Sequence, residues 1–352
     1  MARSLLGLDI GTSAVRAAQV STKTDPATME HFASVELPRG AVSGGEVADH
    51  EAVVSAVKEL MSKGRFSAKR TALGIANQKV VVRQIDMPAM EESELMGALQ
   101  FQAQEYIPIP IEDAILDFQI LEEVASGSGE RQVKVLLVAA QRDMVNGFVS
   151  VAQAAGLDPA VVDLSPFAAM RALASSVPLL GSRQSEAVID IGAGVTDIVV
   201  HEQGKPLFVR ILPMGGQDVT DALVAGSDID EAEAEAVKRR TGLSLETGPL
   251  PAEGAARLIE QRASAFIDEV RGSIDYYLTQ EGATRISTVI LTGGGSKLPG
   301  LPERLSSALH LPVEEGRPLD RVRLGKISQT PDELAQLSAV CSVAIGLAMR
   351  EA

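Results

Sequence analysis

Two segments of the chain, far apart in sequence, each place an aspartate directly before a turn of small residues. In the first, the apolar run 5–8 leads to Asp9, and Gly11, Thr12 and Ser13 are followed by a second apolar run. Two apolar runs around a short turn of small residues predict a β-hairpin. The backbone N–H groups of such a turn can converge on a phosphate, against which Asp9 could hold a hydrated Mg²⁺. On its own, the pattern fits an ordinary tight turn equally well.

The second segment repeats this layout in the later half of the chain. An apolar run contains Asp190, and Gly192, Ala193 and Gly194 precede Thr196 and a further apolar run. The two copies are too far apart to be units of a solenoid, so they favour two related domains that face each other. Two such hairpins could clamp one nucleotide from both sides.

A third segment could supply a wall for a flat ring. The apolar run 289–292 enters Gly293, Gly294 and Gly295, and Lys297 follows shortly after. The three segments, in this order, resemble the two phosphate motifs and the adenosine motif of the actin/Hsp70/sugar-kinase ATPase superfamily. The resemblance implies an α/β protein with the actin-like ATPase fold, in which two related domains surround a nucleotide cleft.

The composition is that of a globular protein with an acidic surface. Of the 352 residues, 45% are hydrophobic and 22% are charged, and the formal net charge is −15. The negative charge argues against a nucleic-acid-binding surface. Cys341 is the single cysteine, and the four histidines lack metal-ligand spacing. The apolar runs are too short to insert into a membrane and no signal peptide is recognisable, so we expect a cytoplasmic protein.

The region 78–157 differs in pattern from its surroundings. Its expected elements follow the order strand, helix, strand, strand, helix, at 79–87, 91–107, 114–121, 132–140 and 143–156. In the last of these, Asp143 is expected to cap the helix and Gly156 to end it. We interpret the region as a small α/β subdomain inserted into the first domain.

The remaining patterns divide the chain into two domains around this insert. The first domain has expected strands and helices at 31–37, 51–63, 71–76, 160–164 and 166–175. The second follows a connection at 181–185, with expected helices at 218–224, 230–241 and 255–280. A helix at 331–350, rich in small residues, would cross back to the first domain. The assignment is therefore 1–77, 158–180 and 338–352 for the first domain, 78–157 for the insert and 186–337 for the second domain.

The insert narrows the resemblance to one family. Residues 80–88, 94–95, 101–108 and 116–119 resemble segments of the PilM family, the actin-like proteins of type IV pilus assembly, which are related to FtsA. The resemblance covers essentially the whole chain. It implies a cytoplasmic ATP-binding adaptor, recruited to the inner face of the cell membrane by the cytoplasmic N-terminal tail of a bitopic, PilN-like protein. Pilus motor ATPases are further candidate partners.

The resemblance also implies a role for each motif residue. Asp9 and Asp190 would lie nearest Mg²⁺, through water, and ATP or ADP would be the nucleotide. The residues that would contact the nucleotide are Gly11, Thr12, Ser13, Arg16, Gly192, Ala193, Gly194, Thr196, Gly215, Gly216, Glu235, Lys238, Gly293, Gly294, Gly295 and Lys297. For Glu235 and Lys238, an exposed helical pair with nothing bound is the alternative interpretation.

One departure from the superfamily bears on catalysis. Actin-like ATPases carry a Gln or Glu after the returning strand that orients the attacking water, and Ser165 stands at the matching position. A serine cannot act as a carboxylate base, and Asp163 would be a residue or two out of register. We therefore expect nucleotide binding with at most slow hydrolysis. An FtsA-like polymerising ATPase or a sugar-kinase-like phosphotransferase is the alternative, whereas a P-loop enzyme is excluded because its motif is absent.

Overall fold

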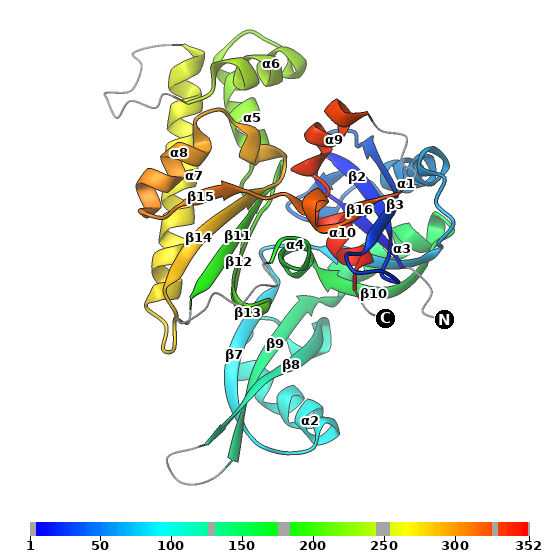
Figure 1. Ribbon diagram of the computed structural model, residues 1–352, viewed down its shortest axis with the longest axis vertical. Helices are drawn as coiled ribbons and strands as arrows, with labels where there is room; N and C mark the ends of the chain where they lie inside the picture. The colour runs from blue at the N-terminus through cyan, green and yellow to red at the C-terminus, as the bar shows by residue number, and fades with distance from the viewer. Residues whose placement is uncertain (1–4, 126–130, 175–183, 244–253, 326–329, 351–352) are drawn as a thin grey trace.

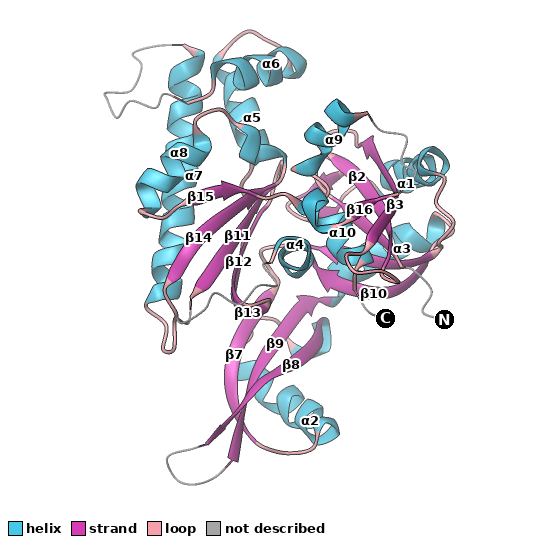
Figure 2. Ribbon diagram, in the orientation of Figure 1, coloured by secondary structure: helices cyan, strands magenta, loops and turns pink. Residues whose placement is uncertain are grey.

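The protein is described by a computed structural model that covers residues 5–125, 131–174, 184–243, 254–325 and 330–350 (Figure 1). Two lobes, each built on a mixed sheet with helices packed on it, lie beside each other, and a three-stranded sheet extends below them (Figure 2). Within these ranges we find no helix that combines the length and the apolar character of a membrane span.

The first sheet is built around the predicted N-terminal hairpin. Strands β1 (Leu6–Ile10) and β2 (Ala14–Ser21) pair antiparallel with Ile10 opposite Val15, and the three residues 11–13 separate the two strands. The sheet order is β10-β6-β1-β2-β3-β16. The other strands are β3 (Thr28–Glu36), β6 (Arg70–Ile75), β10 (Asp158–Leu164) and β16 (Arg323–Leu324), and β4 (Val42–Ser43) with β5 (Glu46–Val47) forms a separate ribbon.

The second sheet repeats the arrangement of the first. Its order is β13-β12-β11-β14-β15, and β11 and β12 form the second predicted hairpin, with Ile191 opposite Thr196. In both sheets the first hairpin strand has a parallel neighbour and the second an antiparallel one. This shared order confirms the predicted pair of related domains. The strands are β11 (Ser185–Ile191), β12 (Thr196–Glu202), β13 (Lys205–Leu212), β14 (Ile286–Thr292) and β15 (Val313–Glu315).

Helices cover both sheets, and several begin where a side chain accepts a hydrogen bond from the first turn. Asp49 accepts from the N–H of Ala52 before α1, and Asp230 accepts from the N–H of Glu233 before α6. The helices of the first lobe are α1 (His50–Gly64), α3 (Arg142–Ala154) and α4 (Ser165–Leu173). Those of the second lobe are α5 (Gly216–Gly226), α6 (Glu231–Thr241), α7 (Ala255–Leu278) and α8 (Leu301–Leu309).

The inserted region forms its own small sheet and core. Strands β7 (Val81–Pro88), β8 (Ala114–Ala125) and β9 (Arg131–Gln141) are arranged β7-β9-β8. Helix α2 (Glu92–Gln102) is shorter than predicted, because the chain tightens into a 3₁₀ turn at Ala103–Glu105. The buried Leu95 and Leu99 of α2 pack with strand residues in a core separate from those of the two lobes.

Helix α3, which the sequence assigned to the insert, packs with the first lobe. Its buried Phe148 and Val151 belong to the same hydrophobic core as α1 and β1. The predicted cap is wrong: α3 begins at Arg142 after Gln141, and the carboxylate of Asp143 makes no capping bond. We therefore propose that the insert ends near Gln141 and not at residue 157; the other predicted domain boundaries remain proposals.

The predicted C-terminal helix 331–350 is broken in two. Helices α9 (Pro331–Ser338) and α10 (Ser342–Ala348) are separated at residues 339–341. The carbonyl of Ala339 accepts the hydroxyl of Thr292 at 3.0 Å and the N–H of Gly293 at 2.6 Å. In a continuous helix that carbonyl would accept an N–H four residues on. A tertiary contact from the second lobe therefore ends α9.

Helix α10 returns to the first lobe, as its small residues predicted, and its backbone packs directly against the backbones of β1 and α4. A Cβ atom at Gly7 of β1 would lie 2.1 Å from the carbonyl of Ala344, and one at Gly346 would lie 1.8 Å from the carbonyl of Ala168 in α4. Glycine is required at both positions, because any side chain would push α10 away. The predicted connection 181–185 lies outside the described residues as far as residue 183.

Candidate nucleotide site

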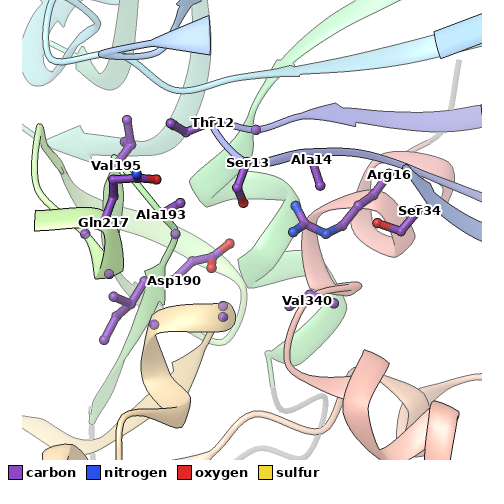
Figure 3. Close-up of a pocket in the computed structure, with 18 of the residues that line it drawn as sticks. Thr12, Ser13, Ala14, Arg16, Ser34, Asp190, Ala193, Val195, Gln217 and Val340 are labelled. Atoms are coloured by element: carbon purple, nitrogen blue, oxygen red, sulfur yellow. The ribbon is translucent and has the colours of Figure 1, made fainter. Parts of the chain in front are cut away.

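The two hairpin turns and the glycine segment after β14 open onto one cleft of about 1930 Å³ between the lobes. Figure 3 shows Arg16 from the first lobe and Asp190 from the second pointing toward each other in this space. Of the predicted site residues, those that line the cleft are Asp9, Gly11, Thr12, Ser13, Arg16, Asp190, Gly192, Ala193, Gly215, Gly216, Glu235, Lys238, Gly293, Gly294, Gly295 and Lys297.

The two remaining predicted residues have other positions. Gly194 faces the opposite hairpin, since a Cβ atom there would lie 3.0 Å from the side chain of Thr12. Thr196 is fully buried, and its hydroxyl donates to the carbonyl of Met214 at 2.9 Å. Thr196 thus fixes the segment that carries Gly215 instead of facing the cleft.

Backbone atoms of the second lobe are stacked closely along the cleft wall. The N–H of Gly216 donates to the carbonyl of Gly192 at 3.0 Å, and a Cβ atom at Gly215 would lie 2.4 Å from the carbonyl of Ala193. Gly293 has a φ of 85°, and a Cβ atom there would lie 2.3 Å from Oδ1 of Asp190. Side chains are excluded from this wall, so a ligand meets bare backbone.

The cations of the predicted set are partly engaged within the protein. Nζ of Lys238 donates to the carbonyl of Gly216 at 3.0 Å and to the hydroxyl of Thr220 at 2.9 Å. Partial burial acts to raise the pKa of Glu235, but hydrogen bonds and charge from Lys238 hold it below its usual value. Nζ of Lys297 donates to the carbonyl of Gln336 on α9 at 2.7 Å. The pair on α6 is therefore anchored to α5 at the cleft edge.

The first hairpin contains a carboxylate and a cation in register. Asp9 lies opposite Arg16 across β1 and β2, and Nη1 of Arg16 is 3.6 Å from Oδ2 of Asp9. Burial raises the pKa of Asp9, while the charge of Arg16 opposes the shift. Arg16 in turn lies opposite Ser34 on β3. Its Nε is buried without a hydrogen-bond partner among the described residues.

The second hairpin contains two carboxylates in register, of which the sequence reasoning found one. Asp197 on β12 lies directly opposite Asp190 on β11 and also lines the cleft. Burial, and next the charge of Asp9, raises the pKa of Asp190 to about 7. Burial, reinforced by Asp190 and Asp9, raises the pKa of Asp197 well above its usual range. The signal was present, because opposite residues of a hairpin point to the same face of the sheet.

This donor set fits a hydrated divalent cation bound together with phosphate. Within the described part of the chain, no group of three or more His, Cys, Asp or Glu side chains is arranged to hold a metal by itself. Oδ1 of Asp197 is buried and lacks a hydrogen-bond partner there, and glycines leave room beside Asp190. Mg²⁺ commonly takes one or two carboxylates and completes its shell with waters and phosphate oxygens.

The two candidates for orienting water differ in position. Ser165 begins α4, is buried and lines the cleft. Asp163 is held by Arg171 at 2.9 Å and by Arg350 at 2.8 Å, and it accepts the N–H of Leu164. Asp163 thus ties α4 and the segment after α10 to β10, so it is not placed to act as a base in the cleft.

Comparison with known proteins agrees with this architecture. A family model described as type IV pilus assembly protein PilM matches residues 7–352. The chain belongs to the PilM family. A structure of a PilM–PilN type IV pilus biogenesis complex superposes on it with a TM-score of 0.86 and 31% identity, covering 100% of this chain and 99% of that one. The actin-like ATPase fold and the family resemblance predicted from the sequence are therefore confirmed.

More distant matches to this PilM-family chain are found in sequence and in fold. Cell division protein FtsA of Escherichia coli K12 is 27% identical over 373 residues, covering 93% of this chain and 87% of FtsA. A structure of MreB5 of Spiroplasma citri bound to ADP has a TM-score of 0.56 with 13% identity, over 98% of this chain and 94% of that one. The latter likeness concerns the fold alone.

Proposed function

We propose that the protein is an ATP- or ADP-binding adaptor of a type IV pilus assembly platform. The observation that carries the nucleotide half of the proposal is the junction of both hairpins and the glycine wall on one cleft. Arg16 and Asp197, which line the cleft, each have a buried polar atom, Nε and Oδ1, without a hydrogen-bond partner among the described residues. A phosphate with its cation would supply partners for both.

Asp9 and Asp190 would hold the cation through water, with Asp197 beside them. The backbone N–H groups of Thr12, Ser13 and Ala193 would donate to the phosphates, and the guanidinium of Arg16 would add positive charge. The N–H groups of Gly11 and Gly192 already donate within their own turns, to the carbonyls of Ala14 and Val195. When bound, Mg²⁺ would neutralise phosphate charge. Ser165 supplies a hydroxyl where hydrolysis needs a side chain that orients water, so turnover should be slow.

The partner half of the proposal concerns the insert. The structural relative is a complex with PilN, and we propose that this chain binds the cytoplasmic N-terminal tail of a bitopic, PilN-like protein. That tail would recruit the chain to the inner face of the cell membrane, where pilus motor ATPases are further candidate partners. In the order β7-β9-β8, the outer strand β8 presents an edge that an extended peptide could join. The other outer strand, β7, contacts the second lobe, where the amide of Gln84 donates to the carbonyl of Leu207 on β13 at 2.9 Å. Leu95 and Leu99 are buried in the insert's own core, so they would not contact the tail.

The nucleotide half is tested by calorimetry and thermal unfolding with Mg-ATP. Bound nucleotide should stabilise the fold by about 2.7 kcal/mol at a hundredfold excess over Kd. Failure of any adenine nucleotide to bind would contradict the proposal. Steady ATP hydrolysis at about 1 s⁻¹, within the range of ordinary enzymes, would show an ATPase instead of an adaptor.

The partner half is tested by truncating the insert at a point where its strands are paired. Gln84 of β7 lies opposite Leu136 of β9, so an Asn-Gly turn can join them and replace residues 85–135. The truncated chain keeps Val82 and Leu136, which pack into the first-lobe core. It should bind Mg-ATP as the full chain does and lose the tail peptide of its PilN-like partner. Equal peptide binding by both proteins would place the partner site elsewhere.

A further inference from the structure

Arg39 links the two lobes at a point that the nucleotide motifs do not include. It follows β3 of the first lobe, and its guanidinium forms an ion pair with Asp221 on α5 of the second lobe. The same guanidinium pairs with Glu231 in the first turn of α6 at 3.1 Å. All three side chains are about half exposed, so these contacts lie at the protein surface.

The two helices held by Arg39 are those that carry residues of the cleft. Helix α5 begins at Gly216, and α6 carries Glu235 and Lys238. The amide of Gln217 donates to Glu231 at 3.0 Å, and its backbone N–H donates to the carbonyl of Ala193 at 2.8 Å. Hydrogen bonds therefore run from the Arg39 ion pairs to the second hairpin.

A second contact between the lobes is of a different kind. The hydroxyls of Thr292 and Ser342 lie 2.5 Å apart and are fully buried, so solvent does not compete for them. The Arg39 ion pairs are open to water and to salt, and exposed pairs of this kind are individually weak. The Arg39 side can therefore break while the buried contact persists.

We propose that Arg39 is a positioning residue that holds α5 and α6 against the first lobe and thereby sets the rate at which a nucleotide leaves the cleft. The inference rests on the proposed nucleotide binding. With the ion pairs formed, the second-lobe wall stays over the ligand. With them broken, the helices that carry Gly216 and Lys238 are free to move outward.

The test is the dissociation of a fluorescent ADP analogue from the full chain with Mg²⁺, chased with excess ADP in a stopped-flow instrument. Arg39→Gln should release it about fivefold faster, equivalent to about 1 kcal/mol at 1.4 kcal/mol per factor of ten. Arg240→Gln is the matched control, because it removes an exposed arginine from the end of α6. Arg240→Gln should release the analogue at the wild-type rate. Arg39→Lys keeps the positive charge and should release it at a rate between those of the wild type and Arg39→Gln.

Salt and charge exchange separate positioning from a general loss of stability. Release from the wild type should accelerate toward about 1 M salt, where the Debye length is about 3 Å, and release from Arg39→Gln should not. The double variant Arg39→Asp with Asp221→Arg should slow release relative to either single variant. Thermal unfolding checks that each variant is folded.

Each remaining outcome overturns a definite claim. If Arg39→Gln binds the analogue and releases it at the wild-type rate, the role of Arg39 is wrong and nucleotide binding stands. If the wild type binds no analogue at all, nucleotide binding and the role of Arg39 fail together. If Arg240→Gln accelerates release as much as Arg39→Gln does, the effect is one of net charge and the positioning role is wrong.

Discussion

The two hairpins have the same backbone arrangement but differ in the charges that face each other across the two strands. In the first, the residue opposite Asp9 is Arg16, so the acid has a cation on the neighbouring strand. In the second, the residue opposite Asp190 is another acid, Asp197. Like charges directly opposite each other in a sheet are unfavourable. The first hairpin therefore supplies a cation for its own acid, whereas the second supplies none and depends on a proton, a bound cation or the facing Arg16.

Removing one charge from each hairpin should therefore affect the folded state differently. Asp9→Asn removes the acid opposite Arg16 on its own hairpin, although Asp190 still faces Arg16, and should lower the free energy of unfolding by about 1 kcal/mol. Asp197→Asn removes an acid that has no cation partner among the described residues, and should leave the free energy of unfolding unchanged or raise it. Urea denaturation at pH 8, without nucleotide or Mg²⁺, measures both. Equal losses in the two variants would contradict the contrast between the hairpins.

The binding of Mg-ATP should depend more on the acid of the second hairpin than on that of the first. Asp190→Asn should weaken Mg-ATP binding about thirtyfold, within the range of about 10–100-fold seen when groups that act through a metal's ligands are removed. Asp9→Asn should weaken it less, because Arg16 already shares the charge of Asp9. Calorimetry with Mg²⁺ and with EDTA measures the difference. An Asp190→Asn loss that is equally large in EDTA would show that Asp190 does not act through the cation.

Protonation should reveal the same asymmetry. The pKa of Asp190 is raised from 3.8 to about 7, so the folded protein binds more protons than the unfolded chain between these values. The contribution of Asp190 to stability is therefore complete below about pH 4 and is lost as pH rises through about 7. Between pH 5 and pH 8 the free energy of unfolding of the wild type should fall by about 2.7 kcal/mol more than that of Asp190→Asn, because the pKa of about 7 lies two pH units above the start of this range and each unit is worth about 1.36 kcal/mol. Parallel pH profiles of the two proteins would contradict the raised pKa.

The turns themselves should differ least. A Cβ atom at Gly192 would lie 2.7 Å from the carbonyl of Val195, and one at Gly11 would lie 3.3 Å from the carbonyl of Ala14. Gly192→Ala should therefore cost about 1 kcal/mol more stability than Gly11→Ala, a difference in the ordinary range of single substitutions. Thermal unfolding of both variants without ligand measures it. The reverse order would indicate that the first turn is the more constrained one.

Sequence alone predicted what is encoded locally. The hairpins could be predicted because a strand, a small-residue turn and a returning strand are adjacent in the chain. The glycines that line the cleft could be predicted for the same reason, since they follow apolar runs directly. Asp197 was not predicted, because it follows its turn and the shared pattern places an acid before each turn; the pairing register places it beside Asp190.

Long-range contacts account for the rest. The break between α9 and α10 depends on Thr292 and Gly293, which lie more than forty residues away in sequence. Helix α3 follows the insert directly, and only packing against α1 shows that it belongs to the first-lobe core. The partners of Arg39 lie on helices of the other lobe, and no local pattern indicates such a pair.

The carbonyl of Ala339 has a mechanical consequence. It joins the end of β14, through Gly293, to the chain that leads into α10 and the first lobe. If the lobes rotate relative to each other about this fulcrum, displacement grows with distance from it. Gly293 beside Asp190 would then move little, and α6, which Arg39 contacts through Glu231, would move further. The part of the cleft at Gly293 and Asp190 can therefore keep its structure while the edge at α6 opens, so that a nucleotide bound near the rotation axis would be exposed with little change in its immediate contacts.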